Sequence, residues 1–182
     1  RRASIAFKQA GEAIYLFGAE PWATPNAARG HLGQSLWLRE LHGREDGPPP
    51  HVDLTLEKYQ GEFIRELIAA GLVSAVHDVA DGGLAVALAE MALAGGMGAE
   101  VTQHPNYTAA AWWFGEDQGR YVVTVPDMEA FQQQIAKGTR DADTASRGLR
   151  RIGTTGGDSL LGVTLDALRQ AHEGFFKDWM ED

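Results

Sequence analysis

The sequence predicts an α/β (α+β) fold in which a mixed β-sheet is flanked by helices. Segments with helical spacing of apolar residues alternate along the chain with short apolar runs typical of strands. Short spacings around glycine also predict hairpins, which are incompatible with an all-parallel sheet. With 182 residues, 44% of them hydrophobic and 22 of them glycine, the chain has the size of a single domain with many tight turns.

Seven segments are predicted as strands because they are short, apolar and bounded by turn residues. They are residues 3–8, 12–17, 73–76, 99–102, 120–125, 151–155 and 160–163. The first two are expected to pair as a hairpin across Gln9-Ala10-Gly11, and the last two across Gly156-Gly157. Residues 21–25 are expected to form a loop.

Four segments are predicted as helices from their apolar spacing: residues 33–41, 56–68, 83–94 and 127–137. Gly71 ends the second of them, and GREDGPPP at 43–50 separates the first two. The helix at 83–94 is apolar except for Glu90, so it should be buried on most faces against a sheet that includes 73–76. The polar segment 138–147 is expected to form an exposed turn or a short helix.

The most informative feature is the strand-to-helix turn that carries His77, Asp78, Asp81, Gly82 and Gly83. Helix starts present free backbone N–H groups, at which anions and phosphates settle readily. Carboxylates beside a phosphate need a hard divalent cation such as Mg²⁺ between them. The turn is therefore the leading candidate for a ligand site.

Structural explanations of the same turn remain open. Asp81 is well placed to be the N-cap of a helix that starts at Gly82. The glycines are also explained if they only allow close packing of the helix on the sheet. His77 and Asp78 are also explained if they satisfy each other at the end of the strand.

A second candidate site is the loop that enters the strand at 120–125. Glu116, Asp117 and Gln118 offer acceptors and an amide there, which suit hydrogen bonds to ribose hydroxyls or to a glycinamide. The alternative is a solvated loop in which Arg120 pairs with Glu116.

Composition excludes several classes of function. The chain has no cysteine, which excludes disulfides and thiolate zinc sites, and its histidines lack metal-ligand spacing. A formal charge of −9 argues against nucleic-acid binding. No apolar run reaches the roughly 18 residues of a membrane span and no signal-peptide segment opens the chain, so a cytoplasmic protein is expected. The GDSL at 157–160 is a chance match to an esterase motif, and Trp112-Trp113 is expected in the core or an interface.

The segment 77–101, HDVADGGLAVALAEMALAGGMGAEV, resembles the His-Asp-x-Ser/Ala-Asp-Gly-Gly-Leu segment of the phosphoribosylformylglycinamidine synthase family. The resemblance is to the C-terminal, AIR-synthase-related domain of the PurL-type synthetase subunit of purine biosynthesis. Further stretches resemble that family in the same order, at 13–20, 32–36, 113–123 and 168–180. Gln34 replaces a glycine of the family pattern, and Asp117 stands where serine is common.

This resemblance implies a function. Members convert formylglycinamide ribonucleotide to formylglycinamidine ribonucleotide with ATP, Mg²⁺ and glutamine-derived ammonia: ATP phosphorylates the amide oxygen and ammonia displaces the phosphate. Their partners are a glutamine amidotransferase subunit and a small bridging subunit. Residues 1–182 are then one domain excised from a larger chain, whose catalytic histidine and main ATP and Mg²⁺ ligands lie elsewhere. The residues of the turn and the loop, together with Arg120, are expected to shape a nucleotide or substrate cleft without performing the chemistry, and the isolated domain is expected to be inactive.

Two other functions remain open. One is another enzyme of the same superfamily, namely aminoimidazole ribonucleotide synthase, selenophosphate synthetase or thiamine-phosphate kinase. His77 before Asp78 disfavours these, because their segments usually lack that histidine. The other is a non-catalytic scaffold that holds a structural nucleotide and docks subunits.

Overall fold

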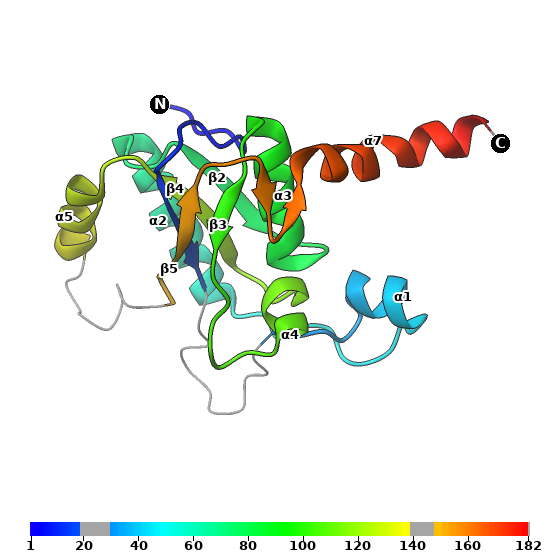
Figure 1. Cartoon of the computed structure of the whole chain (residues 1–182). Coiled ribbons are helices and arrows are strands. Elements are labelled where there is room, and N and C mark those ends of the chain that lie inside the picture. Colours follow the sequence, from blue (N-terminus) through cyan, green and yellow to red (C-terminus); the bar gives the residue numbers. More distant parts are fainter. Residues whose placement is uncertain (19–29, 139–147, 182) are drawn as a thin grey trace.

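The computed structural model describes residues 1–18, 30–138 and 148–181, and Figure 1 shows its course. The strands are β1 (Ala13–Phe17), β2 (Ala75–Val79), β3 (Ala99–Val101), β4 (Arg120–Val125), β5 (Arg150–Thr155), β6 (Ser159–Leu160) and β7 (Val163–Thr164). The helices are α1 (Leu36–His42), α2 (Leu54–Ala70), α3 (Gly83–Gly95), α4 (Ala109–Phe114), α5 (Met128–Gly138) and α7 (Leu165–Glu181).

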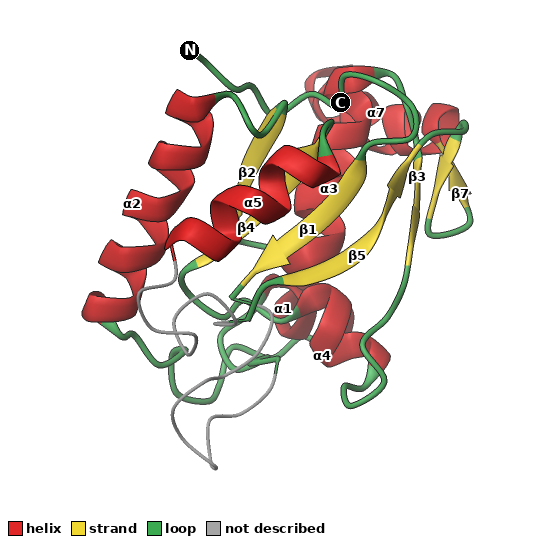
Figure 2. Cartoon of the chain, turned by 90° about the vertical axis from the view of Figure 1, so that its left-hand side faces the viewer, coloured by secondary structure: helices red, strands yellow, loops and turns green. Residues whose placement is uncertain are grey.

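The described strands form a seven-stranded sheet in the order β2-β4-β1-β5-β3-β6-β7. All neighbours are antiparallel except β3 and β6, which run parallel. The predicted mixed sheet flanked by helices is confirmed. Figure 2 shows α5 in front of the sheet and α3 behind it, with α2 along one side.

Two apolar clusters on opposite faces of the sheet hold the layers together. Alternate residues of β1 divide between them, as the two-residue period of a strand requires. Ile14 and Leu16 pack in the cluster with α3 and Trp112, which confirms the expected core position of that tryptophan. Ala13 and Phe17 pack in the other cluster, with α2 and α5. β1 is therefore an interior strand, with apolar side chains on both faces.

Helix α3 confirms the prediction of a buried helix against the sheet. Leu84, Leu88 and Met91 are fully buried in the first cluster. Only a narrow side faces solvent, where Val86 is 38% exposed and Glu90 is also exposed. The helix ends at Gly96, whose left-handed backbone donates to the carbonyls of the last turn.

Both predicted hairpins are wrong. Residues 3–8 form no strand with β1; Ser4 makes an isolated bridge to Ala75 and Phe7 is buried against α3. β1 pairs instead with β4 and β5, because a strand with two buried faces needs a neighbour along each edge. β5 and β6 do not pair either: Gly156 and Gly157 exchange hydrogen bonds with Gly98, and β6 pairs with β3 and β7.

Several boundaries differ from the prediction. The first helix begins at Leu36 and not at 33, because Ser35 caps it with its hydroxyl. β2 runs to Val79, so His77 and Asp78 lie within the strand. Helices α4 and α7 were not predicted. The predicted loop at 21–25 and all but the first residue of the polar segment 138–147 lie outside the described residues. In the part of the chain that the structure describes, no helix is long and apolar enough to cross a membrane.

Candidate functional site

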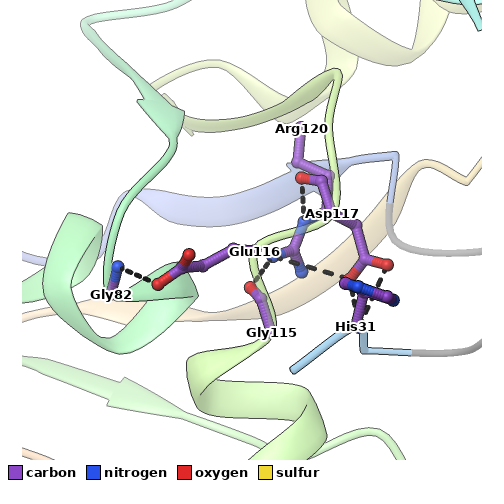
Figure 3. Close-up of polar contacts among 6 residues, drawn as sticks. All are labelled: His31, Gly82, Gly115, Glu116, Asp117 and Arg120. Atoms are coloured by element: carbon purple, nitrogen blue, oxygen red, sulfur yellow. Dashed lines mark hydrogen bonds and ion pairs between the residues drawn. The ribbon is translucent and has the colours of Figure 1, made fainter. Parts of the chain in front are cut away.

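Three segments that are distant in sequence meet beside the start of α3, as Figure 3 shows. They are the turn at residues 80–83, called here the glycine turn, the loop at residues 115–119, called the carboxylate loop, and the segment 31–36. The structure thus brings together the two candidate sites predicted from the sequence. It adds a third segment that the prediction had not assigned to the site.

His77 lies between two carboxylates on the strand that leads into the glycine turn. Its Nε2 is 2.6 Å from Glu90 Oε2, and its Nδ1 is 3.2 Å from Asp78 Oδ1. The expected pairing of His77 with Asp78 is present, but the shorter contact is to Glu90, which the prediction missed. The signal for it was there: Glu90 is the one charged residue in an apolar helix. The side chain of His77 is 17% exposed and that of Asp78 is 68% exposed. Of these two side chains, therefore, only Asp78 is open to solvent.

Asp81 is not the N-cap of α3, and that structural alternative is wrong. The N-cap is Gly82, which has φ +79° and no side-chain hydrogen bond, while Asp81 is exposed. The charge of Asp81 reaches α1 instead: the pKa of Arg39 is raised, first by its hydrogen bond to Glu40 and further by the charges of Glu40, Glu45 and Asp81. Asp81 is therefore near enough to α1 for its charge to act on Arg39.

Both glycines of the turn are required by its backbone. Gly83 has φ +71°, and a Cβ on it would lie 2.7 Å from the carbonyl oxygen of Gly115. A Cβ on Gly82 would lie 2.4 Å from the side chain of Val86. Their N–H groups are already paired, since Gly82 donates to Glu116 and Gly83 to the carbonyl of Ala80. These two amides are therefore not free to hold a phosphate, contrary to the expectation for a helix start.

Glu116 is the central acceptor of the site. Its Oε1 accepts from the backbone N–H of Gly82 and from that of Leu36, each at 2.8 Å. Its own N–H donates to the carbonyl of His31 at 3.0 Å. The carboxylate thus lies at the starts of both α1 and α3, where the helix dipoles favour a negative charge. It occupies the place that an anionic ligand was expected to take.

Asp117 and Arg120 hold the carboxylate loop from the other side. Both oxygens of Asp117 lie 3.2 Å from the N–H of His31. Arg120 is 5% exposed and donates to the carbonyls of Asp117 and Gly115. Burial lowers the pKa of Arg120, and the nearby charges of Asp117, Tyr107 and Glu116 oppose that shift. The guanidinium lies 3.9 Å from Asp117, so the nearest carboxylate is not the Glu116 that the solvated-loop alternative required.

Gln34 is a further residue whose role the sequence did not reveal. Its backbone is left-handed at φ +58°, a conformation that favours glycine. Its side-chain amide donates to the carbonyls of Glu45 and Gly47, each at 3.1 Å, and its N–H donates to that of Asp46. These bonds offset the backbone strain. They also explain how this chain departs from the glycine of the family pattern.

The candidate residues therefore fall into two groups. His77, Gly82, Gly83, Glu116, Asp117 and Arg120 are committed to contacts within the chain. Asp78, Asp81 and Gln118 are exposed beside them. Among the described residues, no three His, Cys, Asp or Glu side chains gather in a way that could hold a metal ion, so these residues alone do not fit a Mg²⁺ centre.

Sequence comparison places the chain in a family. The profile described as "AIR synthase related protein, C-terminal domain" matches residues 9–165. The chain is 62% identical over 181 residues to the phosphoribosylformylglycinamidine synthase subunit PurL of Erythrobacter litoralis, covering 100% of this chain and 24% of that protein. It is 48% identical over 183 residues to the PurL subunit of Zymomonas mobilis, covering 98% of this chain and 23% of that protein. The chain thus spans about a quarter of the length of these relatives.

Comparison of structures agrees on the fold. Thermotoga maritima PurL complexed with FGAR superposes with a TM-score of 0.62 at 17% identity, covering 91% of this chain and 29% of that one. The hydrogenase maturation protein HypE in complex with ATP superposes with a TM-score of 0.53 at 17% identity, covering 89% of this chain and 48% of that one. At such identities the likeness concerns the fold alone. Together with the sequence match, it leads to one conclusion: the chain belongs to the family of AIR synthase related C-terminal domains.

Proposed function

We propose that these residues are the C-terminal domain of a longer ATP-dependent synthetase that converts formylglycinamide ribonucleotide to formylglycinamidine ribonucleotide. The observation that carries this proposal is the end-to-end identity of 62% with a PurL subunit of which the chain covers 24%. This identity runs along the whole domain and is not confined to a short motif that the fold alone would require.

The proposed reaction consumes ATP and ammonia and releases ADP and phosphate, in a C–N bond-forming step of purine biosynthesis in the cytoplasm. Glutamine is the proposed source of the ammonia, through an amidotransferase subunit, and a small bridging subunit completes the complex. A PurLQS complex of Thermotoga maritima is among the structural neighbours, which supports such an assembly. The proposal places the main ATP and Mg²⁺ ligands outside this domain, as the family resemblance implies.

Within this reaction the two groups of residues take different parts. Asp78, Asp81 and Gln118 are exposed and line one wall of the nucleotide or substrate cleft. Glu116, Asp117 and Arg120, with Gly82 and Gly83, hold that wall in shape through hydrogen bonds to the main chain. His77 orients Asp78 through the contact between their side chains. None of these residues is proposed as a catalytic acid, base or nucleophile.

A scaffold role is the second candidate, and one observation favours it. The polar groups of the carboxylate loop are largely used up within the domain, as expected of a wall that supports a site elsewhere. No observation favours the activity of HypE or of another enzyme of the superfamily, because HypE resembles this chain in fold alone.

The test is an assay of the full-length protein with formylglycinamide ribonucleotide, ATP, Mg²⁺ and ammonium ion, following ADP and the amidine product. Turnover that depends on formylglycinamide ribonucleotide supports the synthetase. ATP hydrolysis without amidine formation contradicts it. Turnover by residues 1–182 alone, within roughly tenfold of the full-length rate, would contradict the division of labour between domains.

A further inference from the structure

Helix α1 is rich in apolar residues, yet none of them is fully buried: Leu36, Trp37 and Leu38 are only partly buried and Leu41 is exposed. Four of its seven residues are Leu36, Trp37, Leu38 and Leu41, and Leu41 is 67% exposed. Trp37 lies four positions before Leu41 and Leu38 lies three positions before it, so all three residues share one face of the helix. Figure 1 shows α1 at the periphery of the molecule. A helix with this composition is expected to bury its apolar face.

The position of α1 is nevertheless well defined by hydrogen bonds at both ends. Ser35 caps the first turn, and Gly43 closes the last turn in a left-handed conformation. Glu116 accepts from the N–H of Leu36, which joins the helix to the glycine turn through the same oxygen that binds Gly82. The apolar face is therefore presented in a fixed place and does not fold back onto the core.

We propose that the apolar face of α1 (Trp37, Leu38 and Leu41) packs against another domain of the same, longer polypeptide. This rests on the proposed function, since it needs the longer chain. The supporting observation is that the relatives match this chain from end to end but are about four times as long, so further chain that can cover the face is available within one molecule. A contact within one polypeptide also needs no second binding event, which gives it the advantage of a high effective concentration.

The contact has a consequence for the candidate site. A single carboxylate oxygen of Glu116 joins α1 to the turn that precedes α3 and that contains the exposed Asp81. The domain that covers α1 therefore sets the distance between α1 and the exposed carboxylates of Asp78 and Asp81. The apolar face of α1 and the proposed cleft are therefore adjacent on this domain.

The experiment uses thiol labelling in the full-length protein. Residues 1–182 contain no cysteine, so Leu41→Cys introduces a unique thiol in this domain once any cysteines elsewhere are replaced by serine. The matched control is Arg39→Cys, because two residues place Arg39 on nearly the opposite side of the helix and its side chain is 51% exposed. Labelling of Leu41→Cys is expected to be at least about tenfold slower than that of Arg39→Cys in the native protein, and equal after denaturation.

A photo-crosslinker attached at Leu41→Cys then identifies the covering surface. Crosslinked peptides from outside residues 1–182 of the same polypeptide support the proposal. Crosslinks to a second copy, crosslinks only within residues 1–182, or equal native labelling of the two variants overturn it. No step of this test measures turnover, so a full-length protein that lacks the proposed synthetase activity would still report whether α1 is covered.

Discussion

The backbone N–H of Gly82 donates to the carboxylate of Glu116 at 2.8 Å, across 34 positions of the sequence. The same oxygen accepts from Leu36, 80 positions away. One side chain therefore fixes the relative positions of two helix starts. This makes Glu116 the residue of the candidate site whose loss should be felt most widely.

Replacing Glu116 by alanine should lower the free energy of unfolding by about 1–3 kcal/mol, because two amides lose an ionised acceptor. Glu116→Gln should lose less, since an amide oxygen still accepts, but without the charge. Urea denaturation monitored by circular dichroism measures both. Gln118→Ala, in the same loop but exposed, is the control and should change stability by less than about 0.5 kcal/mol. Equal stability of Glu116→Ala and the parent would show that water replaces the carboxylate at no cost.

Replacing Leu88 by alanine should cost about 2–5 kcal/mol, because the side chain is fully buried between α3 and the sheet. Thermal and chemical denaturation give the value. Val86→Ala on the exposed side of the same helix should cost less than about 1 kcal/mol. A loss below about 1 kcal/mol for Leu88→Ala would mean that this helix is not central to the core.

Replacing Gly83 by alanine should destabilise the protein by more than about 3 kcal/mol. The left-handed backbone strains any Cβ, and here that atom would also meet the carbonyl of Gly115. Gly96→Ala separates the two causes: it has φ +61° but no atom within 4 Å of its Cβ, so only the backbone strain of roughly 1–2 kcal/mol applies. Similar losses for the two variants would show that the close approach to the carboxylate loop carries no cost.

Replacing Asp78 by asparagine in the full-length protein should weaken nucleotide or substrate binding while leaving the melting temperature nearly unchanged. The side chain is 68% exposed, so removing its charge disturbs little packing. Isothermal titration with ATP and with formylglycinamide ribonucleotide, beside a thermal melt, measures both effects. A lowered melting temperature with unaltered binding would assign Asp78 to the structural pair with His77.

Stability should fall in alkaline solution through two tyrosines. Burial raises the pKa of Tyr15, opposed by Arg151, and burial followed by the charges of Asp78 and Glu57 raises the pKa of Tyr121. Because the folded state holds these protons more tightly, their contribution is complete below the ordinary value of 10.0 and is lost as the pH rises through the folded values. Unfolding free energies measured from pH 8 upwards should show a shallower decline in Tyr15→Phe and Tyr121→Phe. An unchanged slope in both variants would assign the alkaline loss to other groups.

Much of the fold follows from local patterns. The buried helix at 83–95 was evident from an apolar run with one charge, and the strand at Arg120–Val125 has the predicted bounds. Such elements are specified by neighbouring residues, which a sequence displays directly. Strand pairing is different, because β1 takes both its partners from more than 100 positions away. A nearby glycine suggested a local hairpin, and the burial of β1 on both faces decided otherwise.

The candidate site was predicted only in part. The turn and the loop were identified from their residue types, but their hydrogen-bond partners were not. The acceptors of the amides at Leu36 and Gly82 depend on a meeting of distant segments that no spacing reveals. The left-handed Gln34 could be suspected only from the glycine of the family pattern. Its stabilising partners, the carbonyls of Glu45 and Gly47, required the structure.

The interior place of β1, between β4 and β5, also has a consequence for how the protein is made. The strand AIYLF leaves the ribosome before β4 and β5, which flank it and are synthesised more than a hundred residues later. At ordinary translation rates that delay is on the order of ten seconds. During it, an apolar strand with both edges unpaired is available to other chains. We therefore expect expression of the domain to improve when chaperones protect the nascent chain and when synthesis of the β4–β5 segment is fast.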